Sequence, residues 1–328
     1  MKLPANVQGE SSLYFEKIYV AGPAFVTFNL LLVLFLSCSK EKNPSANKET
    51  QHKGIDVQLD KQKAKKTNTL AQAKEYYNRG VFNQKQGMQE KAIIEFRKAI
   101  QLLPDYAEAY NNIGTSYQFL GEYDKAIQSY RKSVEAQPDL IEGHHNLGTL
   151  YLLQGEIDQA ITAYKGVIHF KPELATAYVD LGRAYGMSGQ LDQAIEQFKI
   201  ALNLDSNLLE AHYAIGVSYR HQGMFNMATE SLEKVIAQKP NFAEAYLNLG
   251  YAYRDQDKLT EAIDTFYTGS QIAPNNYQIC HELGITYMKQ HRYKKAIVAF
   301  QQALKIQPKA VQTENNLKVA QARLAQKK

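Results

Sequence analysis

The chain has 328 residues, 45% of them hydrophobic, and a formal net charge of +5. Residues 39–70 hold eight lysines against four acidic residues, so the rest of the chain is nearly neutral and lacks the basic footprint of a nucleic-acid-binding protein. Two cysteines, Cys38 and Cys280, are too few for a disulfide framework.

The N-terminal segment predicts contact with a membrane. Twenty uncharged and mostly apolar residues run from Ile18 to Ser37, which is long enough for a helix to cross a hydrocarbon core of roughly 30 Å. The run ends in Phe35-Leu36-Ser37-Cys38, which resembles the lipobox of bacterial lipoprotein signal peptides. That resemblance implies that residues 1–38 are a signal peptide, that Cys38 is lipidated, and that the chain lies outside the inner membrane.

Two other interpretations of residues 1–38 stay open. The run could be an uncleaved membrane helix, and the lysines that follow it would then keep the rest of the chain in the cytoplasm. The segment could also be cleaved to leave a soluble form. In some bacteria an aspartate directly after the lipidated cysteine retains lipoproteins in the inner membrane. Here that position is Ser39, which favours a location in the outer membrane, facing the periplasm.

Residues 39–70 are predicted to be a disordered tether. The segment is rich in Lys, Asn, Gln and Thr and has four large apolar residues, too few to offset the entropy of ordering the chain.

Residues 71–310 contain an internal repeat of 34 residues. A glycine recurs at this interval seven times, and each glycine is followed twelve residues later by an alanine. The glycines are Gly80, Gly114, Gly148, Gly182, Gly216, Gly250 and Gly284. This period predicts a stacked array of seven units, starting at residue 73, rather than one globular core.

Each unit is predicted to be a pair of antiparallel helices. In the second unit, residues 107–120 and 124–137 form the helices, Gly121 makes the turn and Pro138 ends the second helix. Gly114 lies on the apolar stripe of the first helix and is expected to let it approach the second helix at Ala126 and Tyr130.

The unit resembles the tetratricopeptide repeat. The residues that carry the resemblance are Tyr110, Ile113, Gly114 and Tyr117, then Ala126 and Tyr130, then Pro138. The resemblance covers residues 73–310 and implies an all-α fold, a right-handed superhelix of helix pairs with a concave groove. The last part of the chain, 311–328, resembles the helix that caps such arrays, with Ala310, Leu317, Ala320 and Leu324 on one face.

Three positions depart from the repeat pattern. Asp257 and His291 replace the turn glycine, and both residue types tolerate left-handed backbone. Ser206 replaces the closing proline, and residues 205–207 are expected to cap the next helix.

No catalytic, cofactor or metal motif is found in the sequence, so we expect no enzymatic activity, no cofactor and no metal site. His144 and His212 occupy the aromatic position of the first helix and are expected to be packed, hydrogen-bonded rings. Cys280 is expected to be a small buried apolar side chain.

Candidate binding residues lie on the first helices, opposite the packing stripe. Asn112, Asn146 and Asn248 recur at one site and could hold a peptide backbone, or could be structural. Arg183, Arg220 and Arg254, flanked by Tyr213 and Tyr251, suit carboxylates, or could pair with Glu210, Glu244 and Asp255. Apolar anchors for a partner are predicted at Phe119, Leu152, Leu153 and Met187, with Val179.

The sequence therefore predicts a non-enzymatic scaffold that binds protein or peptide partners and is tethered to a membrane, in the bacterial envelope. The alternatives are a cytoplasm-facing, membrane-anchored adaptor for regulation or transport, and a non-catalytic part of a glycosyltransferase-like system. Self-association into a homo-oligomer is left open.

Overall fold

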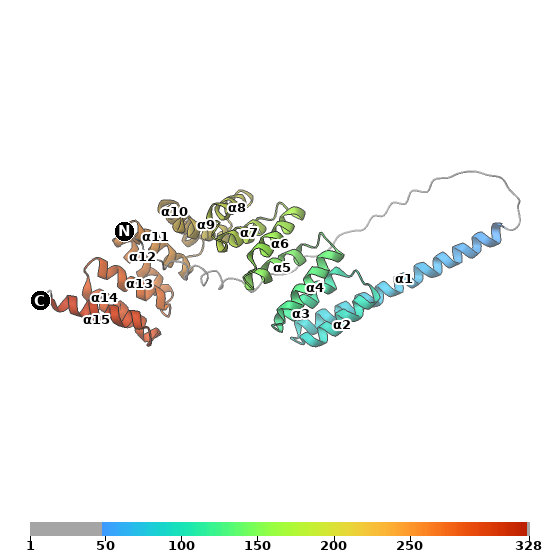
Figure 1. Cartoon of the computed structure of the whole chain (residues 1–328), viewed down its shortest axis with the longest axis horizontal. Coiled ribbons are helices and arrows are strands. Elements are labelled where there is room, and N and C mark those ends of the chain that lie inside the picture. Colours follow the sequence, from blue (N-terminus) through green and yellow to red (C-terminus); the bar gives the residue numbers. More distant parts are fainter. Residues whose placement is uncertain (1–47, 327–328) are drawn as a thin grey trace. The chain divides into compact units, whose positions relative to one another are not determined.

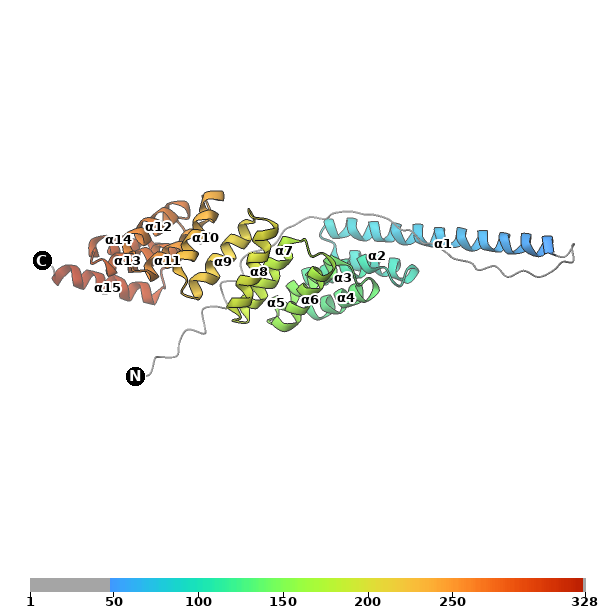
Figure 2. The ribbon, with the colours of Figure 1, turned by 90° about the horizontal axis from the view of Figure 1, so that it is seen from above.

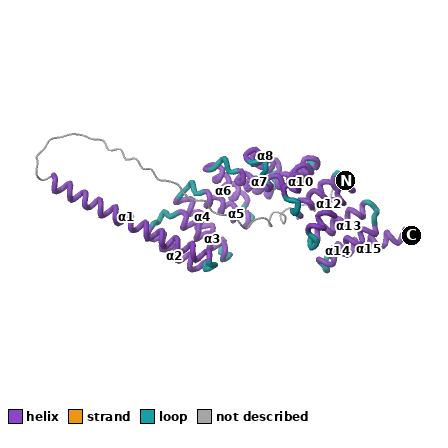
Figure 3. The backbone as a smooth tube through the Cα atoms, turned by 180° about the vertical axis from the view of Figure 1, so that it is seen from behind, coloured by secondary structure: helices purple, strands orange, loops and turns teal. Residues whose placement is uncertain are grey.

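The computed structural model describes residues 48–326, with side chains from residue 63 onward. In this part of the chain all regular structure is helical, as predicted (Figure 3). The helices are α1 (Lys48–Lys85), α2 (Gln89–Leu102), α3 (Ala107–Phe119), α4 (Tyr123–Ala136), α5 (Ile141–Leu153), α6 (Ile157–Phe170), α7 (Ala175–Met187), α8 (Leu191–Leu204), α9 (Leu209–His221), α10 (Phe225–Gln238), α11 (Ala243–Asp255), α12 (Leu259–Ile272), α13 (Tyr277–Lys289), α14 (Tyr293–Ile306) and α15 (Val311–Gln326).

Consecutive helices pack as pairs, each pair forming one repeat. The pairs α1 with α2 and α3 with α4 lie in a compact unit that extends to Leu150. The pairs α7 with α8, α9 with α10, α11 with α12 and α13 with α14 lie in a second unit that begins at Tyr151. Within the second unit the first helices α7, α9, α11 and α13 also contact one another in sequence order.

Each pair is held by the close approach of its two helices at the repeated glycine. All seven glycines are buried, and all seven repeated alanines are 0% exposed. A Cβ built on Gly114 would lie 2.6 Å from the ring of Tyr130, and one on Gly182 would lie 2.5 Å from Phe198. The predicted contact between Gly114 and Tyr130 is therefore confirmed, because only a residue without Cβ fits there.

The turn between the two helices of a pair needs a left-handed residue. Gly121 has a φ of 75°, and the residues that replace the turn glycine, Asp257 and His291, have φ of 59° and 56°. The structure thus confirms that these two residues keep the turn conformation of the other repeats.

Residues 48–70 of the predicted tether are helical rather than disordered, and its residues 39–47 lie outside the described part of the chain. The helical residues belong to α1, whose C-terminal part pairs with α2 while its N-terminal part extends past that helix (Figures 1 and 2). Lys, Gln and Ala are good helix formers, and a helix already nucleated by packing propagates at little cost. A segment that cannot build its own core can therefore continue a neighbouring helix, and residues 63–68 do so with exposed side chains.

The expected cap before α9 is also corrected. Asp205 ends α8, and its Oδ1 accepts a hydrogen bond of 3.0 Å from the backbone N–H of Asn207. The N-cap of α9 is Leu208, which has no side-chain cap bond. The polar residues 205–207 therefore stabilise the turn rather than the start of the helix.

The C-terminal helix α15 covers the last repeat, as predicted. Ala310 is 8% exposed and Ala320 is 0% exposed, and Leu317 packs on the same core as Phe300. Thr313, on the same helix, is 0% exposed.

Within residues 48–326, no helix has the length and apolar character needed to cross a membrane. The predicted membrane segment from Ile18 to Ser37 and the lipidation site Cys38 lie outside the described residues.

Gly182→Ala should destabilise the array. The added methyl would meet the 1% exposed ring of Phe198, and overpacking of this kind costs about 1–3 kcal/mol, more than the helix propensity gained. The urea midpoint, followed by circular dichroism, measures the loss. Gly216→Ala is the matched control, because its Cβ would lie 2.9 Å from the more adaptable Leu232 and should cost less. Equal losses at the two sites would contradict this account.

Candidate functional site

The three predicted asparagines connect neighbouring repeats. Asn112 Nδ2 donates to Tyr77 Oη at 2.9 Å, and Asn146 Nδ2 donates to Asn111 Oδ1 at 2.9 Å. In the second unit Asn248 Nδ2 donates to Tyr213 Oη at 3.1 Å and to the backbone oxygen of its own helix at Glu244.

In each case the acceptor side chain lies 35 residues earlier, on the preceding first helix. Asn248 is only 6% exposed. The sequence left open whether these asparagines bind a peptide or have a structural role. The bonds give them a structural role between repeats, since a buried amide needs hydrogen-bond partners. Contact with a peptide backbone at these sites stays a prediction.

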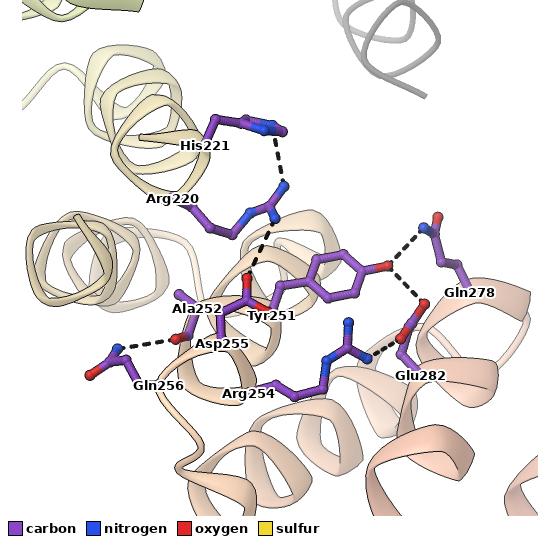
Figure 4. A network of polar contacts seen from close by, with 9 residues as sticks. All are labelled: Arg220, His221, Tyr251, Ala252, Arg254, Asp255, Gln256, Gln278 and Glu282. Atoms are coloured by element: carbon purple, nitrogen blue, oxygen red, sulfur yellow. Dashed lines mark hydrogen bonds and ion pairs between the residues drawn. The ribbon is translucent and has the colours of Figure 1, made fainter. Parts of the chain in front are cut away.

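The predicted arginines Arg220 and Arg254 lie on either side of Tyr251 (Figure 4). The guanidinium carbon of Arg220, on α9, is 5.2 Å from the centroid of the Tyr251 ring, and that of Arg254, on α11, is 5.0 Å from it. Both distances are within the range of cation–π attraction. The structure therefore brings together three of the residues predicted to form a site for carboxylates.

Carboxylates of the chain itself already meet this cluster. Arg220 Nη1 lies 3.8 Å from Asp255 Oδ2, and Arg254 Nη1 is paired with Glu282 Oε2. Tyr251 Oη donates to Glu282 Oε1 at 3.1 Å and accepts from Gln278 Nε2 at 2.9 Å. We call Arg220, Tyr251, Arg254, Asp255 and Glu282 the arginine–tyrosine cluster.

The arginine–tyrosine cluster is electrically balanced, with two guanidinium and two carboxylate groups. Its side chains come from α9, α11 and α13, so it links the first helices of three successive repeats (Figure 4). Arg220 Nη2 also donates to Nε2 of His221 at 3.2 Å, and burial, with the charge of Arg220, lowers the pKa of His221. The sequence analysis gave pairing with Asp255 as the alternative to a site for a partner's carboxylates. The contact between Arg220 and Asp255 confirms that pairing.

Glu282 is a member that the sequence analysis missed. Glu282 lies 28 residues after Arg254, its partner. Another contact between successive first helices has the same interval: Gln84 Nε2 donates to the backbone oxygen of Asn112, 28 residues later, at 3.2 Å. Pairing the end of one first helix with the middle of the next would have identified Glu282.

The other polar candidates lie in separate contacts. Arg183 Nη1 is 3.5 Å from Asp180 Oδ1 on its own helix. The ring of Tyr213 lies 5.0 Å from that of Phe242.

The predicted apolar anchors differ in exposure. Phe119 is 73% exposed in the first unit and Leu153 is 52% exposed in the second. Leu152 and Met187 are partly buried. Val179 is 2% exposed and belongs to the core, so it offers no anchor.

The histidines at the aromatic position are hydrogen-bonded rings, as expected. Nε2 of His144 contacts the backbone oxygen of Pro138 at 2.8 Å, and Nε2 of His212 contacts that of Ser206 at 2.9 Å.

Cys280 is 3% exposed, in agreement with its predicted role, and burial raises the pKa of its thiol. Among residues 48–326, no group of three or more His, Cys, Asp or Glu side chains could hold a metal ion.

His281 connects the last repeat to α15. It is 8% exposed, its Nδ1 lies 2.8 Å from Thr313 Oγ1, and its ring stacks on that of Tyr277 at 5.7 Å. Burial lowers the pKa of His281; the nearby charge of Arg254 adds to this effect and that of Glu282 opposes it.

Models of the tetratricopeptide repeat match residues 69–139, 105–168, 243–276 and 277–310, and a TPR repeat model matches residues 149–189, 187–223 and 218–256. Together these matches cover residues 69–310, which include the whole predicted array of 71–310. No match was found among curated proteins.

Solved structures with the same fold include the C-terminal part of a TPR repeat-containing protein from Cytophaga hutchinsonii, with a TM-score of 0.60 and 19% identity over 74% of this chain and 99% of that chain. A tetratricopeptide repeat protein from Parabacteroides merdae has a TM-score of 0.58 and 17% identity over 76% of this chain and 99% of that one. The APC/C hetero-tetramer Cut9–Hcn1 has a TM-score of 0.56 and 21% identity over 75% of this chain, which spans 48% of the matched chain.

Acid should destabilise the contact between α13 and α15 through His281. Its pKa is lower in the folded chain than the ordinary value of 6.5, so the unfolded chain binds the proton more readily. The contribution of His281 to stability is therefore present above pH 6.5 and is lost as the pH falls through its folded pKa. The variant His281→Gln keeps a hydrogen-bond donor for Thr313. We expect its melting temperature to fall less between pH 7.5 and pH 5.5 than that of the wild type. An unchanged acid sensitivity in the variant would contradict this role.

Proposed function

The chain belongs to the tetratricopeptide repeat family, and on this premise we propose that it is a non-enzymatic scaffold that binds peptide segments of partner proteins along its first helices. The observation that carries the proposal is the exposure of Phe119 and Leu153, at 73% and 52%. Large apolar side chains left in water are a free-energy cost that a binding partner can remove.

Phe119 and Leu153 occupy the same position in successive repeats, the last residue of the first helix. Met187 follows at this position in the next repeat, whereas the remaining repeats have exposed polar residues there. These are Lys85, His221, Asp255 and Lys289. Within the second unit, Leu153 and Met187 thus give this position an apolar character in two successive repeats, which supports a local binding region there rather than a general feature of the array.

In this proposal the arginine–tyrosine cluster has a structural role and is not part of the peptide-binding surface. Because Asp255 and Glu282 already neutralise its guanidinium groups, an acidic peptide would have to displace one of them and leave a part-buried carboxylate without its partner. We therefore assign peptide affinity to the apolar positions. The cluster holds α9, α11 and α13 in a fixed arrangement.

We also propose that the scaffold is tethered to a membrane by the segment from Ile18 to Ser37, with Cys38 as a lipidated residue in the bacterial outer membrane facing the periplasm. The support is the length and apolar composition of that segment and the lipobox resemblance. Retention as a membrane helix with the array in the cytoplasm is the competing topology.

Site-specific photo-crosslinking tests the binding proposal. A benzoylphenylalanine at position 153 of the full chain, irradiated in cells, should give discrete higher-mass adducts. The same residue at the exposed position of Thr162, on the second helix α6, is the matched control and should give none. Met187→Gln should reduce the adduct yield from position 153 severalfold, because Met187 occupies the same position in the next repeat of the same unit. Adducts of equal yield from both positions would contradict a binding role for Leu153.

Radiolabelled palmitate tests the tether. We expect label in the wild-type chain and none in Cys38→Ala, with both chains present in equal amount. Label that persists in Cys38→Ala, or its absence from the wild type, would exclude lipidation at Cys38. Protease digestion of spheroplasts then separates the two topologies, since only a periplasmic array is degraded.

A further inference from the structure

An apolar hollow lies between two neighbouring repeats, separate from the candidate binding residues of the first helices. The hollow has a volume of about 350 Å³ and lies where α8, the end of α9 and the start of α10 meet. Its lining includes the buried side chains Ile195 and Tyr219, at 6% and 4% exposed, and the exposed side chains Met224 and Met227, at 46% and 45%.

The two methionines distinguish this repeat from those that follow. In the next repeat the corresponding residues are Lys258 and Glu261, and in the last they are Arg292 and Lys295. Charged residues suit a surface that faces only water, whereas two adjacent exposed thioethers do not. Methionine is flexible and polarisable, and it is used at binding surfaces that adapt to the side chain of a partner.

The wall of the hollow is fixed by the repeat framework. Gln222 Nε2 donates to Asp192 Oδ1 at 2.6 Å, which joins the end of α9 to α8. The equivalent bond two repeats later joins Gln290 Nε2 to Thr260 Oγ1 at 3.1 Å. The hollow is thus formed by a regular inter-repeat contact, and its apolar lining is what is special to this repeat.

The charges at the hollow indicate what it would accept. Asp192 and Glu196 provide two carboxylates against the single ammonium of Lys199, so the rim has a net negative charge. The volume is near the lower limit of the roughly 300–1,000 Å³ found for ligand pockets, which suits one or two side chains rather than a whole helix.

We propose that this hollow is a second interaction surface, which binds a partner segment carrying one bulky aliphatic or aromatic side chain next to a lysine or arginine. The apolar side chain packs between Met224 and Met227 over Tyr219, and the basic residue pairs with Glu196 or Asp192. The proposal does not depend on peptide binding at the first helices, because its methionines and carboxylates belong to α8 and the start of α10.

Phage displaying random 12-residue peptides would be selected on the full wild-type chain and, in parallel, on the double variant Met224→Lys/Met227→Glu. The variant carries the side chains of the next repeat and should keep the wild-type melting temperature. We expect the wild type to enrich peptides with a bulky apolar residue beside Lys or Arg. A synthetic peptide of that consensus should bind the double variant at least about tenfold more weakly. Val298→Lys, which replaces an exposed apolar residue of α14 by a charged one, is the control, and this variant should bind the peptide as the wild type does.

Glu196→Lys provides a second test that leaves the apolar lining intact. This exposed substitution should weaken binding of the basic peptide and strengthen that of a matched peptide with Glu in place of its basic residues. The proposal is overturned if no enriched peptide depends on Met224 and Met227, or if the enriched peptides are acidic. It is also overturned if the double variant instead abolishes self-association of the chain, which would assign the hollow to a second copy.

Discussion

The close approach of two helices at a residue without a side chain is the contact on which the rest of this protein depends. Gly182 lies so near Phe198 that a single methyl would collide with the ring, and the other glycines that face an aromatic ring repeat this geometry. The fully buried alanines of the second helices complete the contact. Since each pair buries too little apolar surface to be stable alone, the pairs stack, and α15 covers the end of the last one.

Because the packing residues are repeated, the differences between repeats lie in the remaining positions. Some of these positions hold the stack together: Asn248 contacts the preceding first helix, and Arg254 and Tyr251 contact the following one through Glu282. Others place apolar side chains in water, as at Phe119 and Met224. The second group has no evident part in folding, and both binding proposals rest on it.

Two of the corrections to the sequence interpretation concern polar segments, residues 48–70 and residues 205–207. Composition correctly shows that residues 48–70 cannot form a core of their own, but it does not show that they adjoin a helix that is packed farther along. Similarly, the polar residues 205–207 have the right composition for a cap, and yet Asp205 bonds to Asn207 within the turn. The helix at residues 48–70 depends on the packed C-terminal part of α1, whereas Asp205 forms a local bond within its own turn.

The sequence by itself determined the helix pairs, their number and their register, because a spacing of 34 residues and the small residues at Gly114 and Ala126 are sufficient to specify which surfaces pack. It also identified Arg220, Tyr251 and Arg254 as neighbours. Only the tertiary structure decided which charges meet, since Glu282 reaches Arg254 from the next repeat at a distance set by the stagger of the first helices. The hollow beside Met224 likewise exists only because α8, α9 and α10 come together, and no local pattern records the space left between them.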